Sequence, residues 1–396
     1  MAFTAYHVRA GASRMLSGIL DQITISLQLN DTQKVRARQA YSAVTDWLAA
    51  PGSGLESYSP WLFPQGSLAQ DTTVRPISRS EFDLDVICHL DYPESAKPED
   101  LFQLIWDRIH RNETYRPLMT RESRCIRLNY AEDSQFHLDI VPAIPDRGRK
   151  GDFILIPDGS GSGAGMTWKT SNPIGFKEWL EEQKAVVAFA EKRARVDPLD
   201  DPLPAEQKAA LTKSIQLFKR WRDICWEDEP KLATPSIVLT YLAARGNPGE
   251  GSLATSFDYI LDRMAEFADG GETEILSPVN DQEIISEKWL NKPASHDAFV
   301  EEIRDLRRRW DGVLEVADDP SRGIAPLAAA LKDIFGEAVD DAVKSAIHEP
   351  VKVAREEGSL LVEKKSGRLV AGAVPAAVKP VHATYKQQTF YGDGRS

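Results

Sequence analysis

Residues 65–90 read QGSLAQDTTVRPISRSEFDLDVICHL, and the end of this stretch alternates apolar and acidic residues. Successive side chains of a β-strand point to opposite faces. The apolar residues of FDLDV are therefore expected to face a hydrophobic core, while Asp83 and Asp85 share the opposite face. Two carboxylates held this close repel each other unless a cation lies between them. The alternation therefore predicts a strand that carries a divalent-metal site.

A second run, residues 135–141, reads QFHLDIV and alternates in the same way. His137 and Asp139 are expected on its polar face, where Asp139 joins Asp83 and Asp85 on a predicted antiparallel sheet. Three hard oxygen ligands suit magnesium or manganese better than zinc. Two such ions, about 4 Å apart, are the usual means of in-line displacement at phosphorus.

The pair Gly66-Ser67 precedes the acidic strand. Glycine lets the backbone approach a phosphate, and the exposed N–H groups and the Ser67 hydroxyl can donate hydrogen bonds to it. D-x-D strings and Gly-Ser turns are each common. Their combination is more specific here, because the D-x-D motif begins sixteen residues after Ser67 and a lone aspartate follows inside an apolar strand.

Length and composition exclude several classes of protein. At 396 residues the chain is long enough for two domains. The net charge of −12 disfavours binding to a DNA backbone. There is no run of eighteen apolar residues, so no membrane helix is expected, and the N-terminus does not resemble a secretory signal. Three dispersed cysteines without a Cys/His cluster predict reduced thiols in a cytoplasmic protein and no structural zinc site.

Helical periodicity flanks the strand-like region. Helices are expected over residues 8–28, 32–50, 205–224, 237–244, 252–269, 296–315 and 324–348, and the tail, 357–396, is expected to be partly disordered or to dock as an arm. We therefore predict a two-lobed α/β protein. The first lobe has a mixed sheet backed by the N-terminal helices, the second is a helical bundle, and the active site lies in the cleft between them.

Five motifs between residues 65 and 176 resemble those of a known family. They are QGS followed by RP, then EFDLDV, HLDIVPA, ILIPD and W-x2-SNP-x-GF. They look like those of the bacterial CD-NTases of the SMODS type, the cyclic GMP–AMP-synthase-like enzymes of anti-phage CBASS systems. More widely, they resemble the nucleotidyltransferases that include DNA polymerase beta and oligoadenylate synthase. The resemblance implies a polymerase-beta-like catalytic core over 1–175, a helical substrate-binding domain over 176–348, and a C-terminal tail or arm over 349–396.

The resemblance also assigns roles to individual residues. Asp83 and Asp85 match the paired catalytic metal ligands, and Asp139 matches the third carboxylate, which also helps to draw the proton from the attacking hydroxyl. The residues matched to nucleotide binding are Gln65, Gly66, Ser67, Lys219 and Ser236. Lys219 matches a lysine that reaches the donor triphosphate, although a solvated basic helix face is the plainer explanation of it. Ser236 matches a serine that contacts a nucleotide, although a helix N-cap is the plainer explanation.

Ile237 follows this serine, where several relatives carry an aromatic residue that stacks on a base. How the acceptor base is held is therefore open from the sequence. Tyr241, one helical turn further on, is a weak substitute for the missing aromatic.

The activity implied by the resemblance is synthesis of a cyclic di- or oligonucleotide second messenger from nucleoside triphosphates, dependent on Mg²⁺ or Mn²⁺, with release of pyrophosphate. The implied partners are a cyclic-nucleotide-responsive effector, reached indirectly, and regulatory proteins of the same defence system. A monomer that binds neither DNA nor membrane is expected.

Two alternatives stay open: a transferase that modifies a tRNA, protein or small-molecule acceptor, and a non-catalytic nucleotide-binding regulatory module. The latter is disfavoured because all three aspartates are present. A structural interaction protein gains support only from an arginine-rich helix and the tail.

Overall fold

The computed structural model describes residues 10–77, 81–130, 136–159, 165–184, 199, 202–249, 251–346, 360–363, 369–371 and 382–384. Seven strands form one mixed sheet. They are β1 (Trp61–Gln65), β2 (Phe82–His89), β3 (Met119–Arg121), β4 (Ile126–Asn129), β5 (Phe136–Pro145), β6 (Ile154–Asp158) and β7 (Thr167–Ser171). Their order is β1-β2-β5-β4-β3. In addition, β6 pairs with β5, and β7 pairs with β6.

The two acidic strands, β2 and β5, lie side by side in the middle of the sheet. They pair in parallel, with Asp83 opposite His137 and Asp85 opposite Asp139. The prediction that these strands belong to an antiparallel sheet is therefore wrong for this pair. The reason is the long connection between them, which carries helix α4 (Pro98–His110) and allows a parallel crossover. The antiparallel pairing expected between β4 and β5 is confirmed.

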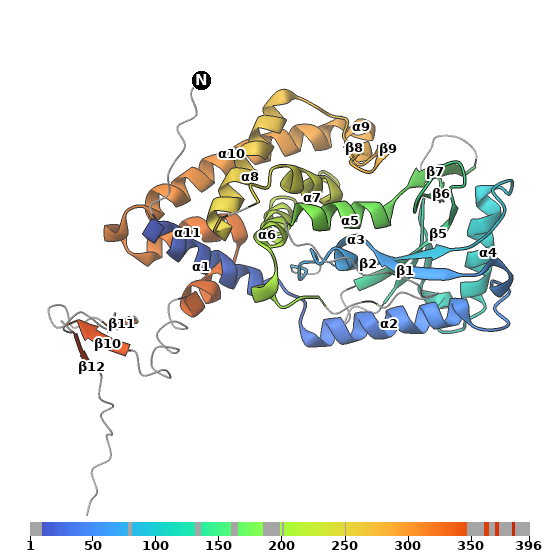
Figure 1. The fold of residues 1–396 in the computed structure, drawn as a ribbon, viewed down its shortest axis with the longest axis horizontal. Helices are drawn as coiled ribbons and strands as arrows, with labels where there is room; N and C mark the ends of the chain where they lie inside the picture. Colours follow the sequence, from blue (N-terminus) through green and yellow to red (C-terminus); the bar gives the residue numbers. More distant parts are fainter. Residues whose placement is uncertain are drawn as a thin grey trace, which may run out of the picture.

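One face of the sheet packs against helices α2 (Asp31–Ala49) and α4 (Figure 1). The apolar side chains of the two acidic strands all join this core, which confirms the predicted alternation. They are Phe82, Leu84, Val86, Phe136, Leu138 and Ile140. Helix α2 begins at a reciprocal capping box, in which Gln33 N donates to Asn30 Oδ1 (2.8 Å) and Asn30 N donates to Gln33 Oε1 (3.0 Å).

The second lobe is mostly helical and lies beside the sheet lobe (Figure 1). Its elements are α5 (Pro173–Gln183), α6 (Ala210–Cys225), α7 (Ser236–Arg245), α8 (Leu253–Gly270), the hairpin β8 (Leu276–Ser277) and β9 (Asn280–Ile284), α9 (Glu287–Asn291), α10 (Pro293–Ala317) and α11 (Ile324–Phe335). Aromatic rings fill its centre. Phe257 lies 4.4 Å from Phe218 and 4.6 Å from Trp310 between ring centroids. The helix expected over 324–348 is interrupted, because Gly336 (φ 75°) ends α11 and a new helical segment follows at 338–346.

The first helix, α1 (Ala10–Ser26), does not back the sheet as expected. Its buried residues, among them Leu16, Ile19 and Ile23, belong to the hydrophobic core of the helical lobe. Of the two N-terminal helices expected to back the sheet, only α2 does so. Amphipathic periodicity shows that a helix buries one face, but it does not identify the surface that covers that face.

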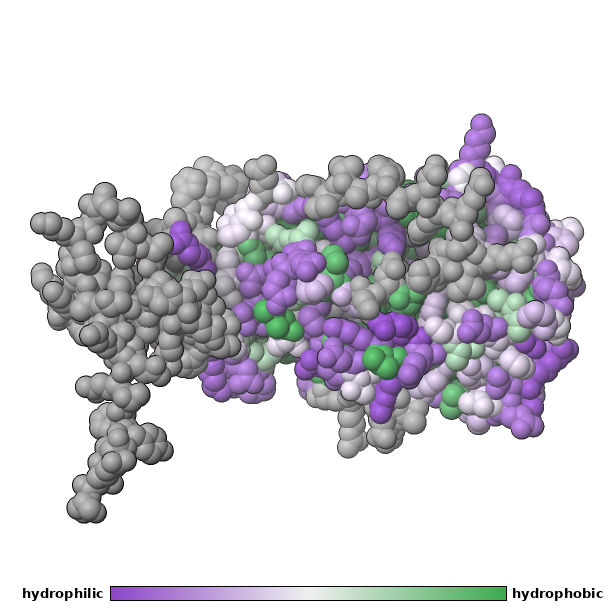
Figure 2. Space-filling view, turned by 60° about the horizontal axis from the view of Figure 1, so that its bottom comes forward, coloured by the Kyte–Doolittle hydropathy of each residue, from purple (hydrophilic) through white to green (hydrophobic). Residues whose placement is uncertain are grey.

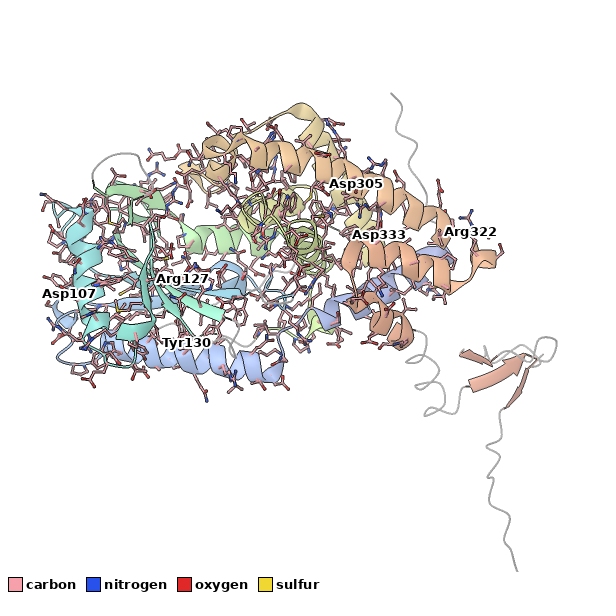
Figure 3. The ribbon with its side chains drawn as sticks, turned by 180° about the vertical axis from the view of Figure 1, so that it is seen from behind. Asp107, Arg127, Tyr130, Asp305, Arg322 and Asp333 are labelled. Carbon is pink, nitrogen blue, oxygen red and sulfur yellow. The ribbon has the colours of Figure 1, made fainter. Side chains whose placement is uncertain are left out.

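Two of the three consecutive arginines 307–309 of α10 join it to neighbouring helices. Arg307 contacts Asp258 (2.9 Å) on α8, and Arg309 contacts Asp333 (3.4 Å) on α11 as well as Asp305 on its own helix. Asp305 and Asp333 are labelled in Figure 3. Arg307 and Arg309 thus link α10 to its neighbours, whereas Arg308 pairs with Asp305 of its own helix.

The face shown in Figure 2 is largely hydrophilic, with apolar residues scattered among the polar ones. Among the described helices, none combines the length and apolarity needed to cross a bilayer. Cys88, Cys125 and Cys225 are free thiols, as predicted. In the tail, β10 (Leu360–Glu363), β11 (Leu369–Ala371) and β12 (His382–Thr384) form a small antiparallel sheet, and the rest of the segment predicted to be disordered or to dock lies outside the described residues.

Candidate active site

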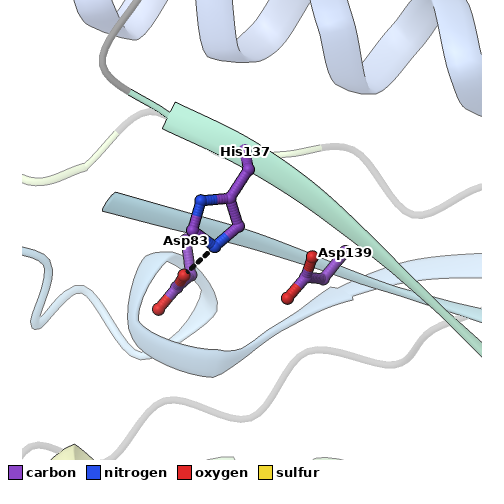
Figure 4. A group of neighbouring side chains, drawn as sticks. All are labelled: Asp83, His137 and Asp139. Atoms are coloured by element: carbon purple, nitrogen blue, oxygen red, sulfur yellow. Dashed lines mark ion pairs between the residues drawn. The ribbon is translucent and has the colours of Figure 1, made fainter. Parts of the chain in front are cut away.

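The acidic side chains of β2 and β5 meet on the face of the sheet that is not covered by α2 and α4. One ligand atom each from Asp83, His137 and Asp139 lies within 4.8 Å of the other two (Figure 4). Asp85 is on the same face, opposite Asp139 in the strand register. Parallel pairing thus brings together the three aspartates predicted from the sequence, and it adds a histidine that sequence reasoning had placed on this face without a role.

His137 lies between two carboxylates. Its Nδ1 is 3.0 Å from Glu81 Oε2, and its Nε2 forms an ion pair with Asp83. Burial disfavours the charged ring, but the hydrogen bonds to Asp83 and Glu81 outweigh burial and raise the pKa of His137 to about 9. The histidine therefore carries a positive charge near neutral pH and orients the Asp83 carboxylate.

Arg127 of β4 holds the third aspartate. It donates two parallel hydrogen bonds to Asp139, from Nε to Oδ1 (2.8 Å) and from Nη2 to Oδ2 (2.7 Å). The two residues are direct partners in the strand register, and Figure 3 shows the position of Arg127 in the sheet. Such bidentate pairs fix both distance and orientation. Sequence reasoning missed Arg127 because its partner becomes evident only once the β4–β5 register is known.

The aspartates differ in their readiness to ionise. Burial opposes ionisation of Asp83, but the hydrogen bond and charge of His137 prevail and lower its pKa. Burial, together with the charges of Asp83 and Asp139, raises the pKa of Asp85 to about 8. The site therefore carries more carboxylates than its own cations can neutralise, and Asp85 keeps a proton near neutral pH unless another cation is bound.

Gly66 touches the acidic cluster. It begins the short helix α3 (Gly66–Ala69) with a φ of 68°, and a Cβ atom added to it would lie 2.1 Å from Asp85 Oδ2. The preceding residue, Gln65, pairs with Asp85 in the β1–β2 register. Only glycine fits this position, because it tolerates the left-handed conformation and leaves room for the carboxylate. The turn predicted to bind phosphate is thus adjacent to the predicted metal ligands.

Ser67 is fixed within its own loop. Its hydroxyl lies 3.0 Å from Thr73 Oγ1, and its carbonyl accepts a hydrogen bond from Thr72 N (2.9 Å). Ser67 and the loop that follows therefore behave as one unit.

Lys219 of α6 points toward this loop. It is 3% exposed, and its ammonium donates to Thr72 Oγ1 (2.8 Å) and to the Thr72 carbonyl (3.2 Å). Burial, reinforced by the nearby charge of Arg222, lowers the pKa of Lys219 to about 7. A solvated basic face, the plainer alternative from the sequence, does not describe this residue.

Ser236 is the first residue of α7, and its hydroxyl accepts a hydrogen bond from Arg222. Pro235 occupies the N-cap position without a side-chain bond, so the alternative reading of Ser236 as an N-cap is wrong.

Tyr241 stacks on Trp179, with ring centroids 5.7 Å apart, and packs against the helical core together with Ile237. The structure thus gives Tyr241 a packing role.

The chain matches one protein-family model and several known proteins. Residues 16–184 match the Second Messenger Oligonucleotide or Dinucleotide Synthetase domain. The chain is 28% identical over 398 residues to a c-di-GMP synthase of Roseivirga ehrenbergii, covering 98% of this chain and 100% of the relative. It is 30% identical over 247 residues, 57% of each protein, to the cyclic dinucleotide synthase CdnG of Bradyrhizobium diazoefficiens.

The fold is similar to that of a solved CD-NTase structure. The structure of the B. diazoefficiens CD-NTase CdnG in complex with GTP matches with a TM-score of 0.64 and 24% identity, covering 84% of this chain and 98% of that one. This likeness confirms the predicted fold class, a polymerase-beta-like nucleotidyltransferase core with a helical lobe.

Proposed function

We propose that the chain is a CD-NTase, a nucleotidyltransferase of the second messenger oligonucleotide or dinucleotide synthetase family, and that it joins two nucleoside triphosphates into a cyclic dinucleotide. The observation that carries the proposal is the meeting of Asp83, Asp85 and Asp139 beside the Gly66 turn. A cyclic dinucleotide is favoured over a larger ring because the relative that matches 98% of this chain is named a c-di-GMP synthase. GTP is therefore the first substrate to test.

The residues of the site fit a divalent cation. Ligand atoms of Asp83, His137 and Asp139 lie within 4.8 Å of one another, and the neighbouring Asp85 has a pKa raised by burial and by the charges of Asp83 and Asp139. We propose Mg²⁺, or Mn²⁺, held by the three aspartates, since carboxylate oxygens are the ligands these ions prefer. When bound, the cation neutralises charge on the triphosphate and lowers the pKa of the attacking hydroxyl.

The raised pKa of Asp85 predicts that metal affinity depends on pH. A proton and a cation compete for this carboxylate, whose pKa is about 8. The apparent affinity for Mn²⁺ is therefore expected to rise by about tenfold per pH unit below pH 8 and then to level off. Calorimetric titration at several pH values, in buffers of different ionisation enthalpy, measures both the affinity and the proton released. An affinity that does not change between pH 6 and pH 8 would contradict the role of Asp85 as a ligand.

The proposed reaction divides its tasks among residues described above. Asp139 accepts the proton of the attacking hydroxyl while Arg127 holds it in place. The Gly66-Ser67 turn and Lys219 bind the donor phosphates. The hydroxyl oxygen of one nucleotide bonds to the α-phosphorus of the other, and the bond from that phosphorus to pyrophosphate breaks. In a second transfer, the free hydroxyl of the linear product bonds to the α-phosphorus of the remaining triphosphate, the bond from that phosphorus to the second pyrophosphate breaks, and the ring closes. Most of the acceleration comes from positioning and charge stabilisation.

Arg127 offers a test of how Asp139 is positioned. Arg127→Met removes the bidentate contact, and Arg127→Lys keeps the charge but loses the fork geometry. We expect the methionine variant to lose about 10- to 100-fold in turnover or Mn²⁺ affinity, as is typical of residues behind a metal ligand, and the lysine variant to recover only part of it. Steady-state rates and calorimetry measure both. Full activity in the methionine variant would show that Asp139 needs no such support.

The activity itself is tested by incubating the purified protein with all four nucleoside triphosphates and Mg²⁺ or Mn²⁺, followed by phosphatase treatment and mass spectrometry. A phosphatase-resistant cyclic product supports the proposal and identifies bases and ring size together. Pyrophosphate release only when a tRNA, a protein or a small molecule is added would favour the acceptor-modifying alternative. Nucleotide binding without pyrophosphate release would favour the regulatory module.

The remaining expectations from the sequence belong to the same proposal. We place the enzyme as a cytoplasmic monomer in bacterial anti-phage signalling, where its product acts on an effector and other proteins of the system regulate it. We also propose the division into a catalytic core over 1–175, a helical domain over 176–348 and a tail from 349, with α1 packed on the helical domain.

A further inference from the structure

The segment Gln70–Arg75 follows the Gly66-Ser67 turn in the sheet lobe, yet the helical lobe holds its backbone. Five of its carbonyl oxygens each accept a hydrogen bond from a side chain of α6 or of the segments beside it. The bonds run from Lys184 to Gln70 (3.2 Å), Lys208 to Asp71 (3.0 Å), Lys219 to Thr72 (3.2 Å), Gln216 to Thr73 (2.7 Å) and Arg220 to Arg75 (2.6 Å). We call Gln70–Arg75 the strap.

The strap also makes an ion pair with the helical lobe. Lys208 Nζ lies 3.0 Å from Asp71 Oδ1, and the lysine side chain is 1% exposed. Asp71 also has a φ of 61°, a left-handed conformation that few side chains other than Asn, Asp and Gly tolerate. A buried pair of this kind adds little net stability compared with apolar residues. It does, however, fix the Asp71 backbone in one geometry, because Lys208 binds both its carboxylate and its carbonyl.

The strap is rigidly joined to the predicted phosphate-binding turn. Asp71 N donates to the Leu68 carbonyl (3.1 Å), Thr72 N donates to the Ser67 carbonyl (2.9 Å), and the Thr73 and Ser67 hydroxyls lie 3.0 Å apart. A displacement of Asp71 must therefore move Ser67 as well.

We propose that Asp71 and Lys208 are positioning residues that hold the Gly66-Ser67 turn, from the helical lobe, in the geometry that receives the donor triphosphate. This inference rests on the proposed function. Neither residue touches the nucleotide; they act through Ser67. Donor binding thereby depends on how the two lobes are joined.

The test compares three variants with the wild-type protein. Asp71→Asn keeps the tolerance for a left-handed backbone and removes the charge, and Lys208→Met keeps the length of the side chain and removes the donor. The double variant Asp71→Asn/Lys208→Met leaves no unpaired charge. Lys213→Met is the matched control, because Lys213 lies close to Lys208 in the sequence, at the start of α6, and pairs with Asp21 of α1 (2.8 Å) and not with the strap.

The measurements are the melting temperature, the steady-state parameters, and the affinity for a non-hydrolysable α,β-methylene triphosphate with Mg²⁺. Each single variant is expected to bind the analogue at least about tenfold more weakly, about 1.4 kcal/mol, with KM raised. The double variant is expected to recover melting temperature but not affinity, because Lys208 then holds neither the side chain nor the carbonyl of residue 71. The Lys213→Met control is expected to stay within about twofold of wild type.

The outcomes separate this inference from the proposed function. If the wild-type protein does not bind the analogue, the proposed function fails and this inference falls with it. If the wild-type protein binds it and the folded single variants bind equally well, the positioning role is wrong. Recovery of both stability and affinity in the double variant would show that the pair is merely structural and would overturn the inference.

Discussion

The double variant Asp83→Asn, Asp85→Asn is expected to make no detectable cyclic product while remaining folded. Both residues lie on β2, where Asp85 is opposite Asp139 and against Gly66, and Asp83 groups with His137 and Asp139. Asparagine keeps the shape of each side chain but removes the negative charge that a divalent cation needs. The loss of about 4 kcal/mol or more of transition-state stabilisation corresponds to at least about a thousandfold in rate. Mass spectrometry of the product and a coupled pyrophosphate assay measure the loss.

The stability of this variant distinguishes a lost site from a lost fold. In the metal-free protein, Asp85 has a pKa of about 8 in the folded state, against about 3.9 when unfolded. The folded state therefore binds more protons, and this residue makes the protein less stable as the pH rises from about 4 to 8. Asparagine removes that cost, whereas losing the Asp83–His137 contact removes a favourable one. The melting temperature at pH 8 in EDTA is expected to stay near that of wild type. Turnover at the wild-type rate in the folded variant would remove the assignment of the site.

The sequence predicts those features of the site that depend on residues close together in the chain, but not those that depend on residues far apart. The faces of β2 and β5 follow from local alternation, because the side-chain period of a strand is fixed, and the structure confirms them. The parallel pairing of these strands was not predicted, since strand order depends on the path of the connecting chain. The packing of α1 on the helical lobe was missed for a similar reason, because several apolar surfaces could cover its buried face.

The roles of the residues that support the site could not be predicted from the sequence. Arg127 and His137 acquire their roles from partners on neighbouring strands, and Lys208 from a loop far away in the sequence. A lone arginine, histidine or lysine carries no such information by itself. The spacing of His137 two residues before Asp139 was the one local hint, since it places both on the same face. Long-range polar contacts therefore remain the main element that a single sequence leaves undetermined.

Replacing Gly66 by alanine is the second variant with a large expected effect. The left-handed φ of 68° alone costs a residue with a Cβ about 1 to 2 kcal/mol. In addition, the new Cβ would lie 2.1 Å from Asp85 Oδ2, so the carboxylate or the turn must move. A displacement of about 1 Å in a reacting group can cost about a hundredfold in rate. We therefore expect Gly66→Ala to lower kcat by about a hundredfold or more and to weaken Mn²⁺ binding.

A matched control separates backbone strain from the displacement of Asp85. Gly271, which follows α8, has nearly the same φ (70°), but a Cβ added there meets no atom within 4 Å. Gly271→Ala should therefore lower the melting temperature through strain alone and leave kcat and Mn²⁺ affinity unchanged. If both variants lose melting temperature to a similar degree and only Gly66→Ala loses metal affinity, the contact with Asp85 is the cause. Equal metal affinity in the two variants would mean that the site tolerates movement of Asp85, and the glycine would then serve the backbone conformation only.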